Sequence, residues 1–217
     1  VTDSVRTTWL TKNSLKYQIN PDWRFIAKLN YSQSTSSLGE FYNGSYTEAV
    51  AGYGYRPVEN DRLNVLMKYT YFYNMPSAGQ TTIANTAAAY IQKDHIFSID
   101  ALYDLTQTWT VGGKYAHRIG QVSQDLVNPQ FFDSRADLYI ARLDWHVVHK
   151  WDMMLEGRVL SLPDAQDRRS GVLVGLYREV DSYFKVGAGY NFTDFSDDLT
   201  NLSYTYQGVF VNVIGKM

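Results

Sequence analysis

The sequence has 217 residues, with 22 acidic and 20 basic side chains, a net charge of −2 and no cysteine. The near-neutral charge argues against a nucleic-acid-binding protein, which usually carries a basic excess. The lack of cysteine excludes disulfides, thiol nucleophiles and cysteine-ligated metals. No run of about 18 apolar residues occurs, so a helical membrane span is excluded. A mean hydropathy of −0.32 remains compatible with a membrane β-barrel, whose strands alternate apolar and polar residues.

Alternation with a period of two is the dominant pattern along the chain. It is clear from residue 22 onward, where five apolar residues share one face: Trp23, Phe25, Ala27, Leu29 and Tyr31. It returns after Asp61, after Trp151 and after Tyr183. Successive side chains of a strand point to opposite faces, so each segment is predicted to be a strand with one apolar and one polar face.

Eleven such strands are predicted in chain order: 7–19, 22–34, 43–56, 61–74, 89–103, 107–121, 135–147, 150–162, 169–180, 182–195 and 203–216. Their connections alternate between short turns and long polar loops, as in outer-membrane barrels. Strands of about 13 residues exceed the five or six typical of soluble sheets and reach the length that a tilted membrane-spanning strand needs. The prediction is an all-β fold, a transmembrane antiparallel up-and-down β-barrel; the alternative is a soluble sandwich or lipocalin-like barrel.

Aromatic residues gather on the apolar face beside the short turns. Eight of them are predicted to form a girdle at one membrane interface: Tyr17, Trp23, Tyr55, Tyr103, Trp109, Trp145, Trp151 and Phe184. Amphipathic rings prefer this depth of a bilayer. The expected location is therefore the bacterial outer membrane, with its lipid and lipopolysaccharide as partners.

The strand count is odd, although a closed antiparallel bacterial barrel needs an even number. The first and the last predicted strands would run in the same direction. We therefore expect a barrel of about 12 strands, of which about 11 are visible here. Residues 1–217 would be a single barrel domain, the C-terminal part of a longer chain.

The polar face is predicted to line the lumen, and it is about two-to-one basic. The lumen-lining candidates are Lys12, Lys16, Arg24, Lys28, Arg56, Lys68, Lys114, Arg118, Arg142, Asp144, Glu156, Arg158 and Lys185. A basic wall favours anions in an open pore. The other interpretation is a filled interior, in which Arg142–Asp144 and Glu156–Arg158 take part in cross-strand ion-pair networks; barrels of 8 to 12 strands have little free lumen.

The sequence offers weak evidence for an enzyme. Four histidines occur, at 95, 117, 146 and 149, but no G-x-S-x-G-like elbow singles out a nucleophile. Asp194, Asp197 and Asp198 could bind calcium at the cell surface, but turn formation by aspartate side chains explains such a cluster better. We therefore expect no catalytic residue, no metal site and no cofactor.

Three segments resemble a known group of proteins: Arg178 to Met217, Trp9 to Trp23, and Tyr53 to Asn64. They are similar to the C-terminal β-barrel region of large, repeat-bearing proteobacterial outer-membrane proteins. Met217 departs from the aromatic residue that usually ends such barrels. The resemblance implies an architecture, a barrel that anchors or threads a large partner region, and no catalytic activity.

Together these observations predict a non-enzymatic membrane anchor of a larger cell-envelope or surface protein. The expected partners, besides lipid, are upstream domains of the same polypeptide or a surface or periplasmic protein; no nucleic acid is expected. The alternative is a narrow anion-preferring channel or export pore with a basic lumen. An outer-membrane hydrolase is the third hypothesis.

Overall fold

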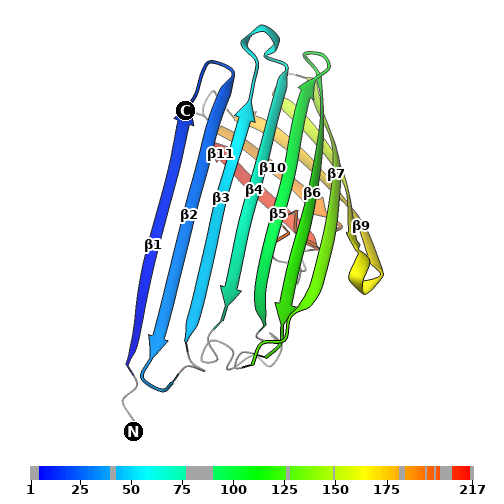
Figure 1. Ribbon diagram of the computed structural model, residues 1–217. Helices are drawn as coiled ribbons and strands as arrows, with labels where there is room; N and C mark the ends of the chain where they lie inside the picture. Colours follow the sequence, from blue (N-terminus) through cyan, green and yellow to red (C-terminus); the bar gives the residue numbers. More distant parts are fainter. Residues whose placement is uncertain are drawn as a thin grey trace.

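A computed structural model describes residues 5–39, 43–76, 90–125, 128–148, 150–180, 184–193, 195–197, 199–200 and 207–215. These residues form one sheet of 11 strands in chain order (Figure 1). The strands are β1 (Arg6–Gln18), β2 (Trp23–Ser36), β3 (Gly44–Tyr55), β4 (Leu63–Met75), β5 (Ile91–Asp104), β6 (Trp109–Ser123), β7 (Phe132–Val148), β8 (Trp151–Leu162), β9 (Asp167–Val180), β10 (Phe184–Asn191) and β11 (Gly208–Gly215). The all-β prediction and its 11 visible strands are confirmed.

Every strand pairs antiparallel with its neighbours in sequence, from β1–β2 to β10–β11. The sheet curls, so that β9, β10 and β11 lie behind the strands at the front of Figure 1. Within the described residues no pairing joins β1 to β11, and the curled sheet is not closed. Short 3-10 turns follow β3 and β8, at Val58–Asn60 and Pro163–Ala165.

The predicted strands agree with the observed ones except near the C-terminal end. The prediction of strand 182–195 is wrong in its last part, because β10 ends at Asn191 and the chain then turns inward. Within the predicted strand 203–216, β11 covers Gly208–Gly215, and residues 203–206 and 216 lie outside the described residues. β9 begins two residues before the predicted strand 169–180, because Asp167 and Arg168 pair with the end of β8. Arg56, the last residue of the predicted strand 43–56, lies in the turn just after β3.

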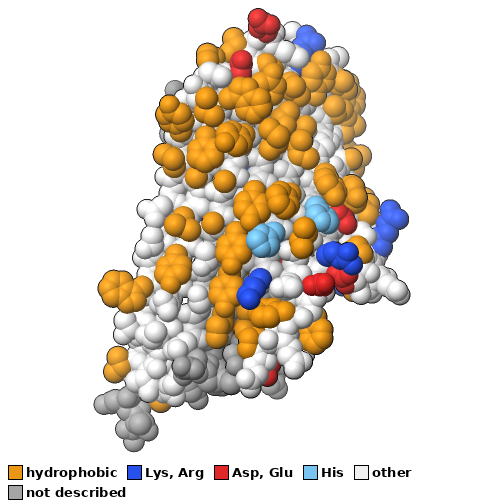
Figure 2. All heavy atoms as spheres, viewed as in Figure 1, with side chains coloured by type: hydrophobic (Ala, Val, Ile, Leu, Met, Phe, Trp, Pro, Cys, Tyr) orange, Lys and Arg blue, Asp and Glu red, His pale blue; other side chains and the backbone are white. Residues whose placement is uncertain are grey.

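The convex face of the sheet is apolar over most of its area. Figure 2 shows hydrophobic side chains spread across the strands, with charged groups at the upper edge and beside two histidines lower down. Many large apolar side chains are exposed there, Phe97, Tyr139 and Val186 among them. Within the described part of the chain, no helix has the length and apolar character needed to cross a membrane.

Candidate functional site

The concave face of the sheet holds the buried core. On β5 to β8 the even-numbered residues point inward, and those that form one buried apolar cluster are Ile96, Ala116, Ala136, Leu138 and Leu160. The alternation that exposes one face of each strand therefore collects small and aliphatic side chains on the other. This apolar floor lies among polar residues, so the interior is neither a uniform polar channel wall nor a uniform core.

A stretch of chain after β10 folds onto this floor. We call it the inner segment; its described residues are Thr193, 195–197, 199 and 200. Phe195 and Leu199 are each 2% exposed and pack against the floor. A strand continuing through residue 195 could not bury these side chains there, which is why the predicted end of this strand fails.

Three polar contacts tie the inner segment to β5 and β6. Lys114 Nζ donates to the carbonyl oxygen of Asp197 at 2.8 Å. Arg118 Nη1 donates to the carbonyl oxygen of Leu199 at 3.3 Å, and Gln92 Nε2 donates to that of Thr200 at 3.0 Å. Buried carbonyl groups need such donors, since a backbone oxygen left without a partner is costly. Two of these three donors, Lys114 and Arg118, are among the residues predicted to line the lumen, and Gln92 is not.

Beneath the inner segment lies a buried ion pair between neighbouring strands. Arg118 Nη1 is 3.6 Å from Asp94 Oδ2, and the two side chains are 1% and 0% exposed. Arg118 also donates to Ser134 Oγ at 2.6 Å, and Gln92 Nε2 donates to Asp94 Oδ2. Among the described residues, Asp94 Oδ1 and Arg118 Nε find no hydrogen-bond partner. Both side chains of the pair are withdrawn from water.

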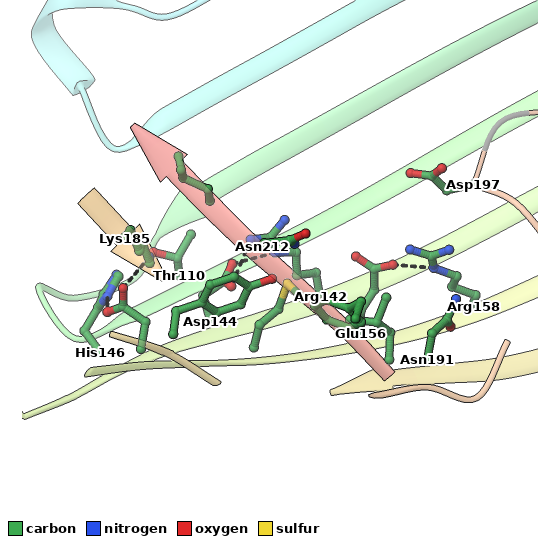
Figure 3. Close-up of a pocket in the computed structure, with 16 residues that line it drawn as sticks. Thr110, Arg142, Asp144, His146, Glu156, Arg158, Lys185, Asn191, Asp197 and Asn212 are labelled. Carbon is green, nitrogen blue, oxygen red and sulfur yellow. Dashed lines mark hydrogen bonds and ion pairs between the residues drawn. The ribbon is translucent and has the colours of Figure 1, made fainter. Parts of the chain in front are cut away.

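Beside the inner segment is a cavity of about 630 Å³ whose lining residues come from β6 to β11 and include Asp197. Figure 3 shows its charged side chains in a row that begins at His146 and ends at Arg158. Four ion pairs make up this row: Arg142 with Asp144, Arg158 with Glu156, Lys185 with Asp152, and His146 with Asp152.

The cavity wall is balanced in charge rather than basic. Its ionisable residues are three bases, Arg142, Arg158 and Lys185, four acids, Asp144, Asp152, Glu156 and Asp197, and His146. The two pairs named from the sequence, Arg142–Asp144 and Glu156–Arg158, are both present, and each joins residues two apart on one strand. Residues two apart share a face of a strand, and Arg142 is also the cross-strand partner of Glu156.

The remaining predicted lumen residues lie toward the β1 edge of the sheet. Lys28 pairs with Glu48 across β2 and β3, with Nζ 2.8 Å from Oε1, and Arg24 Nε donates to Gln18 Oε1 at 2.9 Å. No ion pair involves Lys12, Lys16 or Lys68 within the described residues. Arg56 lies in the turn after β3 and lines a rim pocket with Arg24. The basic excess is therefore concentrated on β1 to β4.

The eight predicted girdle aromatics all lie on the convex face, near the ends of strands at the short turns. Trp109 and Trp145 are direct cross-strand partners and stack with ring centroids 5.2 Å apart. Trp23 and Tyr55 pair in the same way at 4.5 Å. Tyr17, Tyr103, Trp145, Trp151 and Phe184 are exposed, and the other three are half-buried.

Two histidines on the convex face have polar partners but no arrangement for nucleophilic catalysis. His95 Nδ1 is 2.7 Å from the hydroxyl of Tyr69. His117 Nδ1 is 2.8 Å from Asp137 Oδ1, and Ser161 is the cross-strand neighbour of Asp137. The carboxylate therefore lies between imidazole and hydroxyl, whereas a serine nucleophile needs the imidazole between them.

Outside the strands, Asp164 in the turn after β8 binds Arg135. Arg135 Nη2 donates to Asp164 Oδ1 at 2.7 Å, and its backbone N–H donates to Oδ2 at 2.6 Å. These two bonds hold the pKa of the Asp164 carboxyl below its usual range. Within the described residues no group of three or more His, Asp or Glu could hold a metal ion. Asp194, Asp198, His149 and Met217 lie outside the described residues.

Sequence reasoning missed the inner segment. Its one signal was the pair Phe195 and Leu199, two large apolar residues inside a stretch otherwise rich in aspartate. Apolar residues in a polar loop indicate a buried contact, but nothing in the sequence says which surface provides it.

Comparison with known protein families and with curated proteins found no match. Among solved structures, the chain is similar to the NanC porin, with a TM-score of 0.54, 9% identity, and coverage of 99% of this chain and 97% of that chain. It is also similar to the translocator domain of autotransporter NalP from Neisseria meningitidis, with a TM-score of 0.40, 15% identity, and coverage of 87% and 74%. The likeness to the porin shows that this chain has the up-and-down β-barrel type of fold.

Proposed function

We propose that this chain is a bacterial outer-membrane β-barrel that anchors a larger cell-envelope protein, and that its interior is closed by the inner segment. The observation that carries the proposal is the burial of Phe195 and Leu199 on the concave floor. A segment that is packed and hydrogen-bonded inside a small barrel leaves little free passage. The barrel would then act by holding a polypeptide in the membrane.

The convex face supports the membrane part of the proposal. A lipid-facing barrel wall carries an apolar band bordered by aromatic residues, and the exposed apolar side chains with the Trp109–Trp145 and Trp23–Tyr55 pairs fit that description. Outer-membrane lipid and lipopolysaccharide are the proposed partners of this face. The larger polypeptide, or a surface or periplasmic protein, is the proposed partner of the loops.

Limited proteolysis of intact membranes tests the anchor. We expect protease to remove the remainder of the larger polypeptide and to leave a protected fragment that contains β1 to β11. That fragment should stay with the outer-membrane fraction after alkaline washing. A fragment that is released into the soluble fraction would contradict the proposal.

Single-channel recording tests the closed interior. We expect the reconstituted wild-type protein to be silent and the double variant Phe195→Ser, Leu199→Ser to conduct, because two apolar contacts that hold the inner segment are lost. Phe192→Ser is the matched control, since Phe192 is 55% exposed on the convex face. Steady current through the wild-type protein would exclude the closed barrel.

The cavity favours a second candidate, a narrow channel or export pore. It lies inside the curled sheet and is lined by charged side chains, which is the kind of wall that selects among ions. If the wild-type protein conducts, charge reversal tests the lining: Arg142→Glu should shift the reversal potential toward cations. Reversal of Lys93, which points to the convex face, is the control and should leave selectivity unchanged.

A further inference from the structure

Within the described residues neither edge of the sheet has a strand partner, and the two edge strands run in the same direction. Ten successive antiparallel pairings separate β1 from β11, so the two edge strands are parallel to each other. All 13 residues of β1 are exposed, and Val209, Val211 and Val213 of β11 are 67 to 70% exposed. Unpaired N–H and C=O groups cannot stay exposed to lipid. Each edge therefore needs a partner in the membrane.

A second copy of this chain cannot be that partner in an antiparallel barrel. Copies inserted with the same topology present β1 and β11 pointing the same way. Any contact between two edges of like-oriented copies would then be parallel, whether β1 meets β1, β11 meets β11 or β1 meets β11. Bacterial outer-membrane barrels are antiparallel throughout. The fitting partner is a strand that runs opposite to both edges.

The charged side chains at the β1 edge indicate which residues the inner face of the partner strand would carry. Lys12 and Lys16 point inward from β1, and Arg24 and Lys28 do so from β2. Among the described residues of β1 to β3, Glu48 is the acid that pairs with one of these cations, Lys28. On the inner face two cations find carboxylates on the adjacent strand, Lys28 of β2 with Glu48 of β3 and Arg118 of β6 with Asp94 of β5. By the same rule, a strand beside β1 would carry inward-facing carboxylates opposite Lys12 and Lys16.

We infer that one further β-strand lies between β1 and β11 and completes a 12-stranded barrel. Its outward residues are apolar, its inward residues include acids that face Lys12 and Lys16, and it belongs to the larger polypeptide that this barrel anchors. The inference rests on the proposed function. It identifies the β1 edge as the surface where that polypeptide joins the barrel.

Cysteine cross-linking of the full-length protein in outer membranes tests the inferred strand, because the chain contains no native cysteine. One interposed strand separates β1 from β11 by two interstrand spacings, about 9.6 Å, beyond the roughly 7 Å that a disulfide spans between Cα atoms. Oxidation should therefore give no disulfide, whereas a bis-maleimide with a span of about 10 Å, two such spacings, should cross-link. The positions to combine are Trp9, Thr11, Asn13 and Leu15 with Val209, Val211 and Val213.

Two pairs serve as positive controls for oxidation. Asn13 is the cross-strand partner of Leu29, and Val211 is that of Ala188, so both double-cysteine variants should form disulfides. A disulfide between β1 and β11 would overturn the inference in favour of direct parallel closure. Absence of both the disulfide and the bis-maleimide product would also overturn the inference, because β1 and β11 would then lie farther apart than one interposed strand allows. Membrane fractionation precedes cross-linking, so loss of the protein from the membrane would be recognised as failure of the proposed function instead.

A photo-crosslinker at Asn13 identifies the source of the strand. We expect an adduct within the same polypeptide, with no gain in mass, that maps to a segment outside β1 to β11 and carries inward-facing acids. An adduct with a second protein would overturn the assignment to the same polypeptide. The double variant Lys12→Glu, Lys16→Glu should lower the adduct yield at least severalfold. Lys68→Glu on β4, which lies between two paired strands, should not lower it.

Discussion

Thr193 lies directly against Gly171: a Cβ atom placed on Gly171 would come 2.8 Å from the Cα atom of Thr193. Real Cβ atoms essentially never approach another atom that closely. Gly171 is on β9, and Thr193 is the first residue of the inner segment, fully buried at 0% exposure. The missing side chain at 171 is what allows the chain leaving β10 to cross the concave face of β9. Residue 171 therefore has to lack a side chain for Thr193 to lie in this position.

Replacement of Gly171 by valine should expel the inner segment. The added side chain needs the space that Thr193 occupies, and such overpacking costs about 1–3 kcal/mol. A cost of 1.4 kcal/mol changes an equilibrium tenfold, so we expect chymotrypsin to cleave near Phe195 roughly tenfold faster. Gly157→Val is the matched control, because a Cβ at Gly157 meets no atom within 4 Å. Equal cleavage rates for the two variants would refute the role of Gly171.

The buried pair of Arg118 and Asp94 should behave as one unit. Arg118→Met leaves the Asp94 carboxylate buried without its counter-charge, which costs about 3–5 kcal/mol of unfolding free energy. The double variant Arg118→Met, Asp94→Leu should regain most of this loss, because neither charge is then buried. Denaturant unfolding in detergent, followed by tryptophan fluorescence, measures the unfolding free energies of the two single variants, Arg118→Met and Asp94→Leu, and of the double variant. A double variant as unstable as the sum of the single variants would argue against the pairing.

Two phenylalanines near the end of β10 should differ sharply in their contribution to stability. Phe195 is 2% exposed and Phe192 is 55% exposed. Phe195→Ala should lower the unfolding free energy by about 3–5 kcal/mol, as expected for a buried phenylalanine. Phe192→Ala should cost about 0.5–1.5 kcal/mol, the value of its ring contact with Tyr190 at 4.4 Å. The same unfolding assay applies, and similar losses would show that the inner segment is not packed as described.

The Asp164–Arg135 contact should make stability depend on acidic pH. Because the pKa of Asp164 is lower in the folded protein than its usual value, the contact stabilises the fold above the ordinary aspartate pKa of about 3.9. That stabilisation is lost as the pH falls through the lower folded pKa. Asp164→Asn should therefore weaken the protein at neutral pH and match wild type at the acidic end. Thermal unfolding across this range measures the difference, and an equal difference at every pH would contradict the prediction.

Most of the sheet could be predicted from sequence because strand geometry is local. Side chains alternate between faces at every residue, so the positions of Trp109, Trp145, Arg142 and Asp144 on convex or concave faces follow from counting alone. The same rule predicted 11 strands and their antiparallel order. It also implied the parallel edges β1 and β11, since the direction of each strand reverses at every turn.

The tertiary structure alone decided what fills the interior. Lys114 and Arg118 looked like lumen-facing cations, yet each donates to a backbone carbonyl, of a residue 83 and 81 positions away respectively. Alternation gives the face of a residue but not the atoms opposite it, because a contact across the curled sheet depends on curvature and on close approaches such as Gly171 to Thr193. Local periodicity therefore determined the wall of this barrel, and long-range packing determined that its interior is occupied.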